Sequence, residues 1–121
     1  MHAETEIYYE LVEEVVAGIG EAGSDRAVIE GVLVGLGDPA SAGLPTGWTV
    51  VSQSTTTFEG RPAVERVIDI EGQAVRRERI VRAGNTMAIV VTMARHDGEA
   101  ANAPAIRCFE RSIVFAAPPT S

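Results

Sequence analysis

The clearest hydrophobic pattern in the chain is an alternation of large and small side chains over residues 86–94. A period of two is the repeat of a β-strand. Because the small positions are also uncharged, we expect this strand to lie inside a sheet, covered on at least part of both faces. The large side chains are those of Met87, Ile89, Val91 and Met93.

Two reversals connect this strand to the two strands before it. Gly84-Asn85 tolerates the positive φ of a two-residue hairpin turn, which places Ile80 opposite Ile89. The earlier reversal, around Gly72, separates predicted strands at residues 62–70 and 74–82.

Charge selects the register of the earlier hairpin. A two-residue loop would set Arg66 against Arg77 and Glu65 against Glu78, which are two like-charge pairs. A three-residue loop sets Arg66 against Glu78 and Glu65 against Arg79, and facing opposite charges contribute a few tenths to ~1 kcal/mol per pair. The sequence therefore predicts the three-residue loop.

This register predicts one apolar face, which we expect to be the core side. The same face also receives Arg66, Arg76 and Glu78, which an apolar core tolerates only if they are paired or reach solvent. One interpretation is a ligand-binding pocket formed by these three residues between the sheet and a helix. The favoured interpretation is an Arg66–Glu78 pair at the open end of the sheet, with Arg76 extending past it to solvent. The apolar members of the face are Val64, Ile68, Ile70, Ile80, Met87, Ile89, Val91 and Met93.

Residues 48–58 are rich in Thr, Ser and Val, with hydroxyl side chains on both faces. This composition indicates a strand, Trp48–Phe58, at or near the edge of the sheet. An uncovered edge can pair with another chain, so a homodimer formed through Trp48–Phe58 is a predicted self-association.

Helical periodicity predicts the N-terminal part of the fold. Apolar residues recur at three-and-four spacing over Glu4–Gly20, opposite a row of glutamates, which is the pattern of an amphipathic helix. Ser24–Leu36, with an N-cap at Ser24 or Asp25, is interpreted as a short helix, although its Val-Leu-Val run also fits a buried strand.

A last helix is expected near the C-terminus. Asn102 is its predicted N-cap and Pro104 lies in its first turn, after a polar loop over residues 96–101. Its buried face is predicted to carry Ile106, Phe109 and Ile113. The expected fold is a single α+β domain over residues 1–121, in which an antiparallel meander of about four strands packs with an N-terminal and a C-terminal helix as an α/β sandwich.

The net charge of −7 is uneven along the chain. Residues 1–38 contain nine acidic residues and one arginine, while the remainder contains eight acidic residues and nine arginines. Nucleic acid and anionic membranes both require a cationic surface, so neither is an expected partner. No apolar run reaches membrane-spanning length and residues 1–10 do not resemble a signal peptide, so we expect a cytoplasmic protein as given, or an exported one if a leader was removed.

The reactive residue types do not form a recognisable site. Cys108 cannot form an internal disulfide, and between Ile106 and Phe109 it is expected to be a small buried hydrophobe rather than a nucleophile beside His96. His2 and His96 lack metal-ligand spacing. No catalytic residue, metal ion or cofactor is therefore predicted.

Three segments resemble the PsbP/Mog-like superfamily, whose bacterial members include proteins of unknown function. The segments are FEGRPAVERVIDI, RRERIVRAGNTMAIVVTMA and IRCFERSIVF, within a resemblance that covers about residues 45–115. Two features depart from the family: Ile113 replaces an aromatic residue, and the family's opening strands before the first helix are expected to be absent. The sheet would then be short on one side, with its edge covered by residues 24–36 or paired with a second copy. The positions that match are Gly60, Pro62, Ala63, Gly84, Phe109 and Ser112.

The resemblance implies a bacterial, non-enzymatic binding or accessory domain, and no catalytic residue carries over from it. The alternative hypothesis is a small-ligand-binding or enzymatic protein of the cystatin-like type. That alternative requires Arg66, Arg76 and Glu78 to point into an enclosed cavity between sheet and helix.

Overall fold

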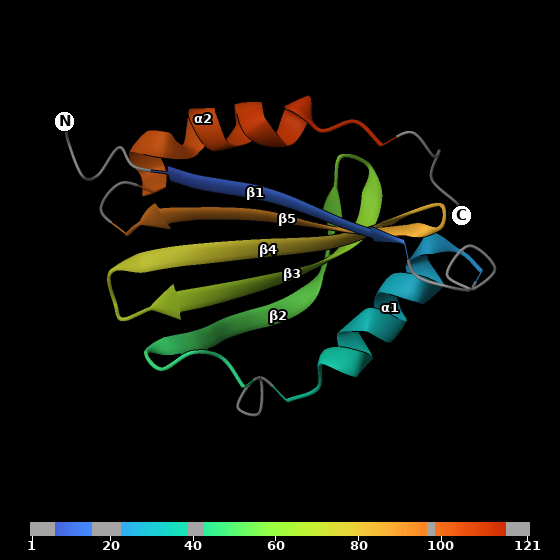
Figure 1. Ribbon diagram of the computed structural model, residues 1–121, viewed down its shortest axis with the longest axis horizontal. Helices are drawn as coiled ribbons and strands as arrows, with labels where there is room; N and C mark the ends of the chain where they lie inside the picture. Colours follow the sequence, from blue (N-terminus) through green and yellow to red (C-terminus); the bar gives the residue numbers. More distant parts are fainter. Residues whose placement is uncertain (1–6, 16–22, 39–42, 97–98, 116–121) are drawn as a thin grey trace.

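The described residues form a five-stranded antiparallel sheet with one helix on each face (Figure 1). The computed structural model describes residues 7–15, 23–38, 43–96 and 99–115. In chain order the elements are β1 (Ile7–Val15), α1 (Asp25–Leu36), β2 (Trp48–Phe58), β3 (Arg61–Ile70), β4 (Ala74–Ala83), β5 (Thr86–Arg95) and α2 (Glu99–Ser112). The α+β class and the antiparallel four-strand meander, β2 to β5, are confirmed.

The strand order across the sheet is β1-β5-β4-β3-β2. The last strand of the meander, β5, is therefore interior, as its uncharged alternation predicts, and β2 is an edge strand. The registers also follow the prediction, since Arg66 lies opposite Glu78, Glu65 opposite Arg79, and Ile80 opposite Ile89.

The predicted first helix, Glu4–Gly20, is wrong where the structure describes it. Residues 7–15 form β1, which pairs along β5 from Ile7–Ala94 to Val15–Thr86, and the rest of the predicted helix lies outside the described residues. The segment is rich in β-branched and aromatic residues, which favour strands. Its apolar residues come in adjacent pairs, so they fit a helical period, but in a strand they divide between both faces. Leu11 and Val12, on opposite faces, are 39% and 41% exposed.

The N-terminal helix of the described fold is α1, within the segment Ser24–Leu36. Ser24 is its N-cap and its hydroxyl accepts a hydrogen bond from the Ala27 N–H at 3.2 Å. Val28 and Ile29 are its buried apolar residues, and the helix packs on β2, β3 and β4. We call the sheet face beneath it the α1 face; it carries Val64, Ile68, Glu78, Arg82 and Val91.

Buried apolar residues lie on both faces of the sheet, and the predicted core face is only one of them. On the α1 face Val64, Ile68 and Val91 are buried, whereas the other large apolar residues predicted for that face are half-buried. A hydrophobic cluster lies on the opposite face, which we call the α2 face, where small side chains let α2 and the segment after it approach the sheet. That cluster consists of Phe58, Ala63, Val81, Ala88 and Val90, with Phe109, Ile113 and Phe115 packed against it.

Helix α2 begins before its predicted cap. It starts at Glu99, so Asn102 is a buried residue inside the helix and Pro104 lies within it rather than in its first turn. The Glu-Ala-Ala sequence at its start has high helix propensity and extends the helix past the signals given by Asn and Pro. The predicted packing residues Phe109 and Ile113 do contact the core.

Candidate functional site

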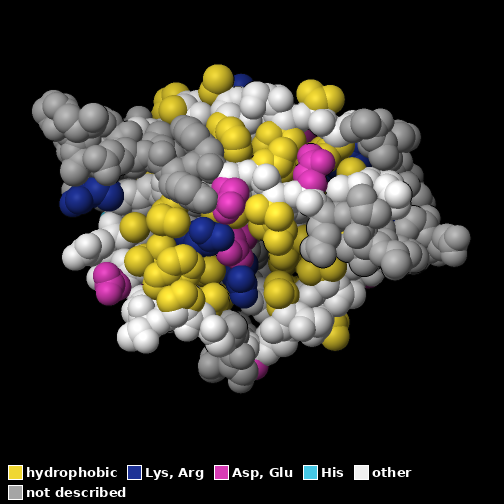
Figure 2. Space-filling model, in the orientation of Figure 1, with side chains coloured by type: hydrophobic (Ala, Val, Ile, Leu, Met, Phe, Trp, Pro, Cys, Tyr) yellow, Lys and Arg dark blue, Asp and Glu magenta, His cyan; other side chains and the backbone are white. Residues whose placement is uncertain are grey.

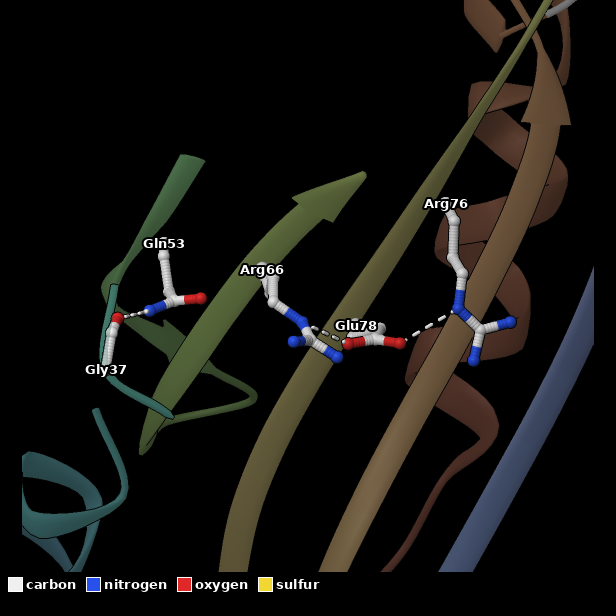
Figure 3. A network of polar contacts seen from close by, with 5 residues as sticks. All are labelled: Gly37, Gln53, Arg66, Arg76 and Glu78. Atoms are coloured by element: carbon white, nitrogen blue, oxygen red, sulfur yellow. Dashed lines mark hydrogen bonds and ion pairs between the residues drawn. The ribbon is translucent and has the colours of Figure 1, made fainter. Parts of the chain in front are cut away.

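The three charged residues predicted as a ligand site lie together on the α1 face, at adjacent positions of β3 and β4 (Figure 3). The Arg66 Nε donates to Glu78 Oε1 at 2.7 Å, and the Arg76 Nε donates to Glu78 Oε2 at 2.9 Å. One carboxylate therefore bridges two guanidinium groups, which leaves the cluster with an excess of positive charge. We call these residues the Arg–Glu–Arg cluster.

The Arg–Glu–Arg cluster is largely withdrawn from solvent. The side chains of Arg66 and Arg76 are each 17% exposed and that of Glu78 is 9% exposed. The Arg76 guanidinium lies over the ring of Trp48, 5.5 Å from its centroid, which is within the range of a cation–π contact. Figure 2 shows charged side chains near the middle of this view, surrounded by hydrophobic ones.

A polar contact continues the cluster towards α1. Gln53 lies opposite Arg66 on β2, and its Nε2 donates to the Gly37 carbonyl at 3.0 Å, at the C-cap of α1 (Figure 3). The Arg66–Glu78 ion pair agrees with the favoured interpretation of the sequence. Arg76, which was expected to extend past this pair to solvent, also bonds Glu78. The role of the cluster as a ligand site stays a prediction.

A fourth charged residue of the same face, Arg82, was not singled out by the sequence. Its Nη1 lies 3.0 Å from Asp25 Oδ1 and 2.6 Å from the Gly23 carbonyl, and its Nε donates to the Gly84 carbonyl at 2.6 Å. Both charged side chains are only 2% exposed. This pair ties the first residue of α1 to the turn between β4 and β5. The alternation of side chains along the strand could have placed Arg82 on this face, because it lies two residues after Ile80, which is on the predicted core face.

A groove of about 620 Å³ runs between α1 and the second half of β2. Ile29 and Pro62 supply apolar surface, the hydroxyl side chains of β2 form one wall, and Arg26 and Glu30 are exposed on the helix side. No member of the Arg–Glu–Arg cluster lines this groove. Its lining residues are Ser24, Asp25, Arg26, Ile29, Glu30, Thr55, Thr56, Thr57, Gly60 and Pro62.

Strand β2 is the uncharged edge of the sheet. All its residues are neutral, and the described part of the chain supplies no strand beyond it. A register shift between Val50 and Ser52 marks a bulge in its first half, and Val51 is 65% exposed. From Ser52 to Phe58 its pairing with β3 is regular. The opposite edge, β1, contains three glutamates.

The backbone of β2 presents alternate residues to the open side. Phe58 and Arg61 flank a two-residue turn whose residues, Glu59 and Gly60, have φ values of 47° and 80°. Such a turn makes the flanking pair a hydrogen-bonded one, so the N–H and C=O groups of every second residue before Phe58 point away from β3. Pro62, which has no N–H, lies opposite one of these residues, as the alternation requires. The outward-facing residues are Gln53, Thr55 and Thr57.

The remaining reactive residues do not converge. Cys108 is exposed on α2, contrary to the prediction of a buried thiol, because its position turns away from the core that Phe109 contacts. It borders a shallow groove of about 530 Å³ with Pro104 and Arg107. His96 instead bonds Asp69, with 2.6 Å between Nε2 and Oδ1.

In the part of the chain that the structure describes, the pKa values of two carboxyl groups are shifted. The hydrogen bond from His96, together with the Gly72 N–H, lowers the pKa of Asp69 below its usual 3.8. Burial raises the pKa of Glu110 above its usual 4.5, although Glu110 forms an ion pair with Arg79 that acts in the opposite direction. Desolvation is the larger of the two effects on Glu110, so the ion pair does not fully compensate for burial.

Among the described residues, no group of three His, Cys, Asp or Glu side chains is placed to hold a metal ion. No helix in the described ranges has the length and apolarity needed to span a membrane. A comparison with protein-family models found no match, and neither did a comparison with curated proteins.

Proposed function

We propose that this chain is a non-enzymatic binding or accessory domain that acts through strand addition at the β2 edge, with a second copy of the chain as its partner. The observation that carries the proposal is a long edge strand without charge; among the described residues neither sheet edge has a further strand, and the other edge, β1, is acidic. Open edges pair readily with other strands, and natural proteins usually block them with charge or proline. Strand β2 contains neither.

The distribution of charge supports a second copy as the partner. The sequence has a net charge of −7, and two such chains repel each other at long range. An edge-to-edge contact through β2 keeps the two β1 strands, with their glutamates, at the far ends of the joined sheets. Among the two sheet edges, β2 is therefore the one where copies meet with the least repulsion.

The resemblance to the PsbP/Mog-like superfamily agrees with a binding role, because that family consists mainly of accessory and binding proteins. The five-stranded sheet with a helix on each face is compatible with a sandwich of this type. Membership of the family remains part of the proposal.

A small-ligand site at the Arg–Glu–Arg cluster is the competing proposal. It is favoured by the excess positive charge of two guanidinium groups that share one carboxylate and remain 17% exposed. A ligand there would need an anionic group to compete with Glu78 for the guanidinium N–H donors.

Amide hydrogen exchange tests strand addition directly. At high protein concentration, the outward-facing amides of Gln53, Thr55 and Thr57 are expected to be protected, and on dilution they should exchange rapidly. The amides of Ser54 and Thr56 face β3 and serve as internal controls, because their protection should not depend on concentration. Fast exchange of the outward amides at every concentration would overturn the proposal.

A further inference from the structure

The proposed strand addition requires a register between the two β2 strands, and the structure restricts it. An isologous contact between identical antiparallel strands places a two-fold axis at one residue or between two. Only the regular part of β2 can continue a ladder, and it is bounded by the bulge near Val51 and by the turn at Glu59-Gly60. That regular part runs from Ser52 to Phe58.

We propose that two copies pair through β2 with Thr55 on the two-fold axis, an inference that rests on the proposed function and specifies its interface. Thr55 is the midpoint of the regular part, so this register pairs all of Ser52 to Phe58 with its counterpart. A shift of the axis by one residue brings either the bulge or the turn into the ladder and shortens the paired segment.

Backbone polarity requires the two-fold axis to lie at a residue rather than between two, which this register satisfies. In an antiparallel ladder, residues with outward N–H and C=O groups must face residues of the same kind. With the axis at Thr55, Thr55 faces its own counterpart and Gln53 faces Thr57 of the second copy. All of these residues have outward-facing backbone groups, so each pair can exchange both hydrogen bonds.

Side-chain pairing is also compatible with this register. The facing pairs are Thr55 with Thr55, Gln53 with Thr57, Ser54 with Thr56, and Ser52 with Phe58, and none contains a charge. Hydroxyl side chains that face each other across strands are stabilising, whereas facing like charges are destabilising. On the α1 face the second strand would also close the open side of the groove between α1 and β2, which Thr55 and Thr57 line.

Matched charge variants test the register by placing charges at facing positions. Ser54 and Thr56 are both exposed, so substitutions there leave the fold of one copy intact. The variant Ser54→Lys/Thr56→Glu places a lysine of one copy opposite a glutamate of the other, at two symmetric sites. The variant Ser54→Lys/Thr56→Lys places lysines opposite lysines. Both share the lysine at position 54, which faces Glu65 of its own chain.

We expect the dimer dissociation constants of these two variants to differ by at least about tenfold, with the Lys/Lys variant weaker. Sedimentation velocity over a concentration series measures both constants. If the wild-type chain dimerises but the two variants have equal dissociation constants, the proposed register is wrong and strand addition still stands. A wild-type chain that is monomeric throughout would overturn both proposals.

Disulfide trapping gives an independent measurement of the register. Facing residues in a non-hydrogen-bonded antiparallel pair have Cα atoms ~4.5 Å apart, which is within the range for a disulfide. In a Cys108→Ser background, an oxidised mixture of Ser54→Cys and Thr56→Cys chains should give a covalent dimer. Neither variant alone should do so to the same extent. Trapping of Ser54→Cys with itself in preference to the mixture would contradict an axis at Thr55.

Discussion

The buried pair of Arg82 and Asp25 joins the first residue of α1 to the sheet. Each side chain is 2% exposed, so Asp25→Ala removes a carboxylate from a buried guanidinium, and breaking a buried ion pair costs ~3–5 kcal/mol. We expect Asp25→Ala to lower the free energy of unfolding by about this amount in urea denaturation. Arg26→Ala, on the neighbouring exposed residue, is the control and should change it by less than about 0.5 kcal/mol.

Replacing both buried partners with apolar residues provides a second test of this pair. Asp25→Leu combined with Arg82→Met should recover much of the stability lost in Asp25→Ala, because both buried charges are then removed together. A single Asp25→Ala variant as stable as the wild type would show that the pair does not anchor α1.

The Arg–Glu–Arg cluster predicts an order of effects among its members. Arg66→Ala leaves Glu78 bonded to Arg76, so we expect a loss of ~1–3 kcal/mol in unfolding free energy. Glu78→Ala leaves two guanidinium groups facing each other without their shared carboxylate and should cost more than either arginine variant. Urea denaturation of the three variants measures the order. If Arg66→Ala leaves stability unchanged but abolishes binding of an anionic ligand, the ligand-site proposal is favoured over the structural one.

Glu110 predicts a pH dependence of stability. Burial raises its pKa above 4.5, so the folded chain holds this proton more tightly than the unfolded chain. The stability gained from this protonated carboxyl is complete at pH values below the pKa of Glu110 in the unfolded chain. It is lost as the pH rises through the pKa of Glu110 in the folded chain. Glu110→Gln should therefore show a smaller fall in stability than the wild type as pH rises from about 4.5, measured by urea denaturation at several pH values. Parallel pH profiles for the two proteins would contradict this assignment.

At the scale of the elements, local charge and turn chemistry predicted more than periodicity did. The facing pairs Arg66–Glu78 and Glu65–Arg79 follow from one requirement, the avoidance of like charges in the hairpin. The Gly84-Asn85 turn and the Ser24 cap were likewise local signals. The polar cluster could be predicted because side-chain parity follows directly from register.

The first strand could not be predicted in the same way, because its conformation depends on a partner distant in the sequence. Ile7–Val15 pairs with β5, and its apolar residues fit a helix as well as a two-faced strand. The Arg82–Asp25 pair depends on where α1 docks, which strand parity alone does not specify. The groove beside β2 is also a result of this docking and has no sequence motif.

Alanine substitutions at two glycines are expected to change the stability of the protein in opposite directions. Gly31 lies within α1, and a Cβ there would meet nothing within 4 Å, so Gly31→Ala should stabilise the protein by about 0.5–1 kcal/mol through helix propensity. Gly47 has φ of 89°, and a Cβ there would lie 2.7 Å from the Glu71 Cγ. Gly47→Ala should therefore destabilise by about 1–2 kcal/mol. Thermal denaturation of both variants checks these signs, and a shift in the same direction for both would contradict the account.

For the whole molecule, the two edges of the sheet differ in a way that determines how copies can meet. Strand β1 is acidic and β2 is neutral, while the chain has a net charge of −7. Association through β2 must overcome the long-range repulsion, which salt screens. We therefore expect the dimer to be strengthened as sodium chloride rises from about 0.05 to 0.5 M. An interface held by ion pairs would weaken instead, and analytical ultracentrifugation distinguishes the two.

The most direct test of the β2-edge proposal is the mass of the wild-type chain, measured by size-exclusion chromatography with light scattering over a dilution series. We expect a dimer of twice the 12.8 kDa chain mass at high concentration, which dissociates reversibly on dilution. A mass of one chain at every concentration would contradict self-association through β2, and the Arg–Glu–Arg cluster would then become the leading candidate for a binding site.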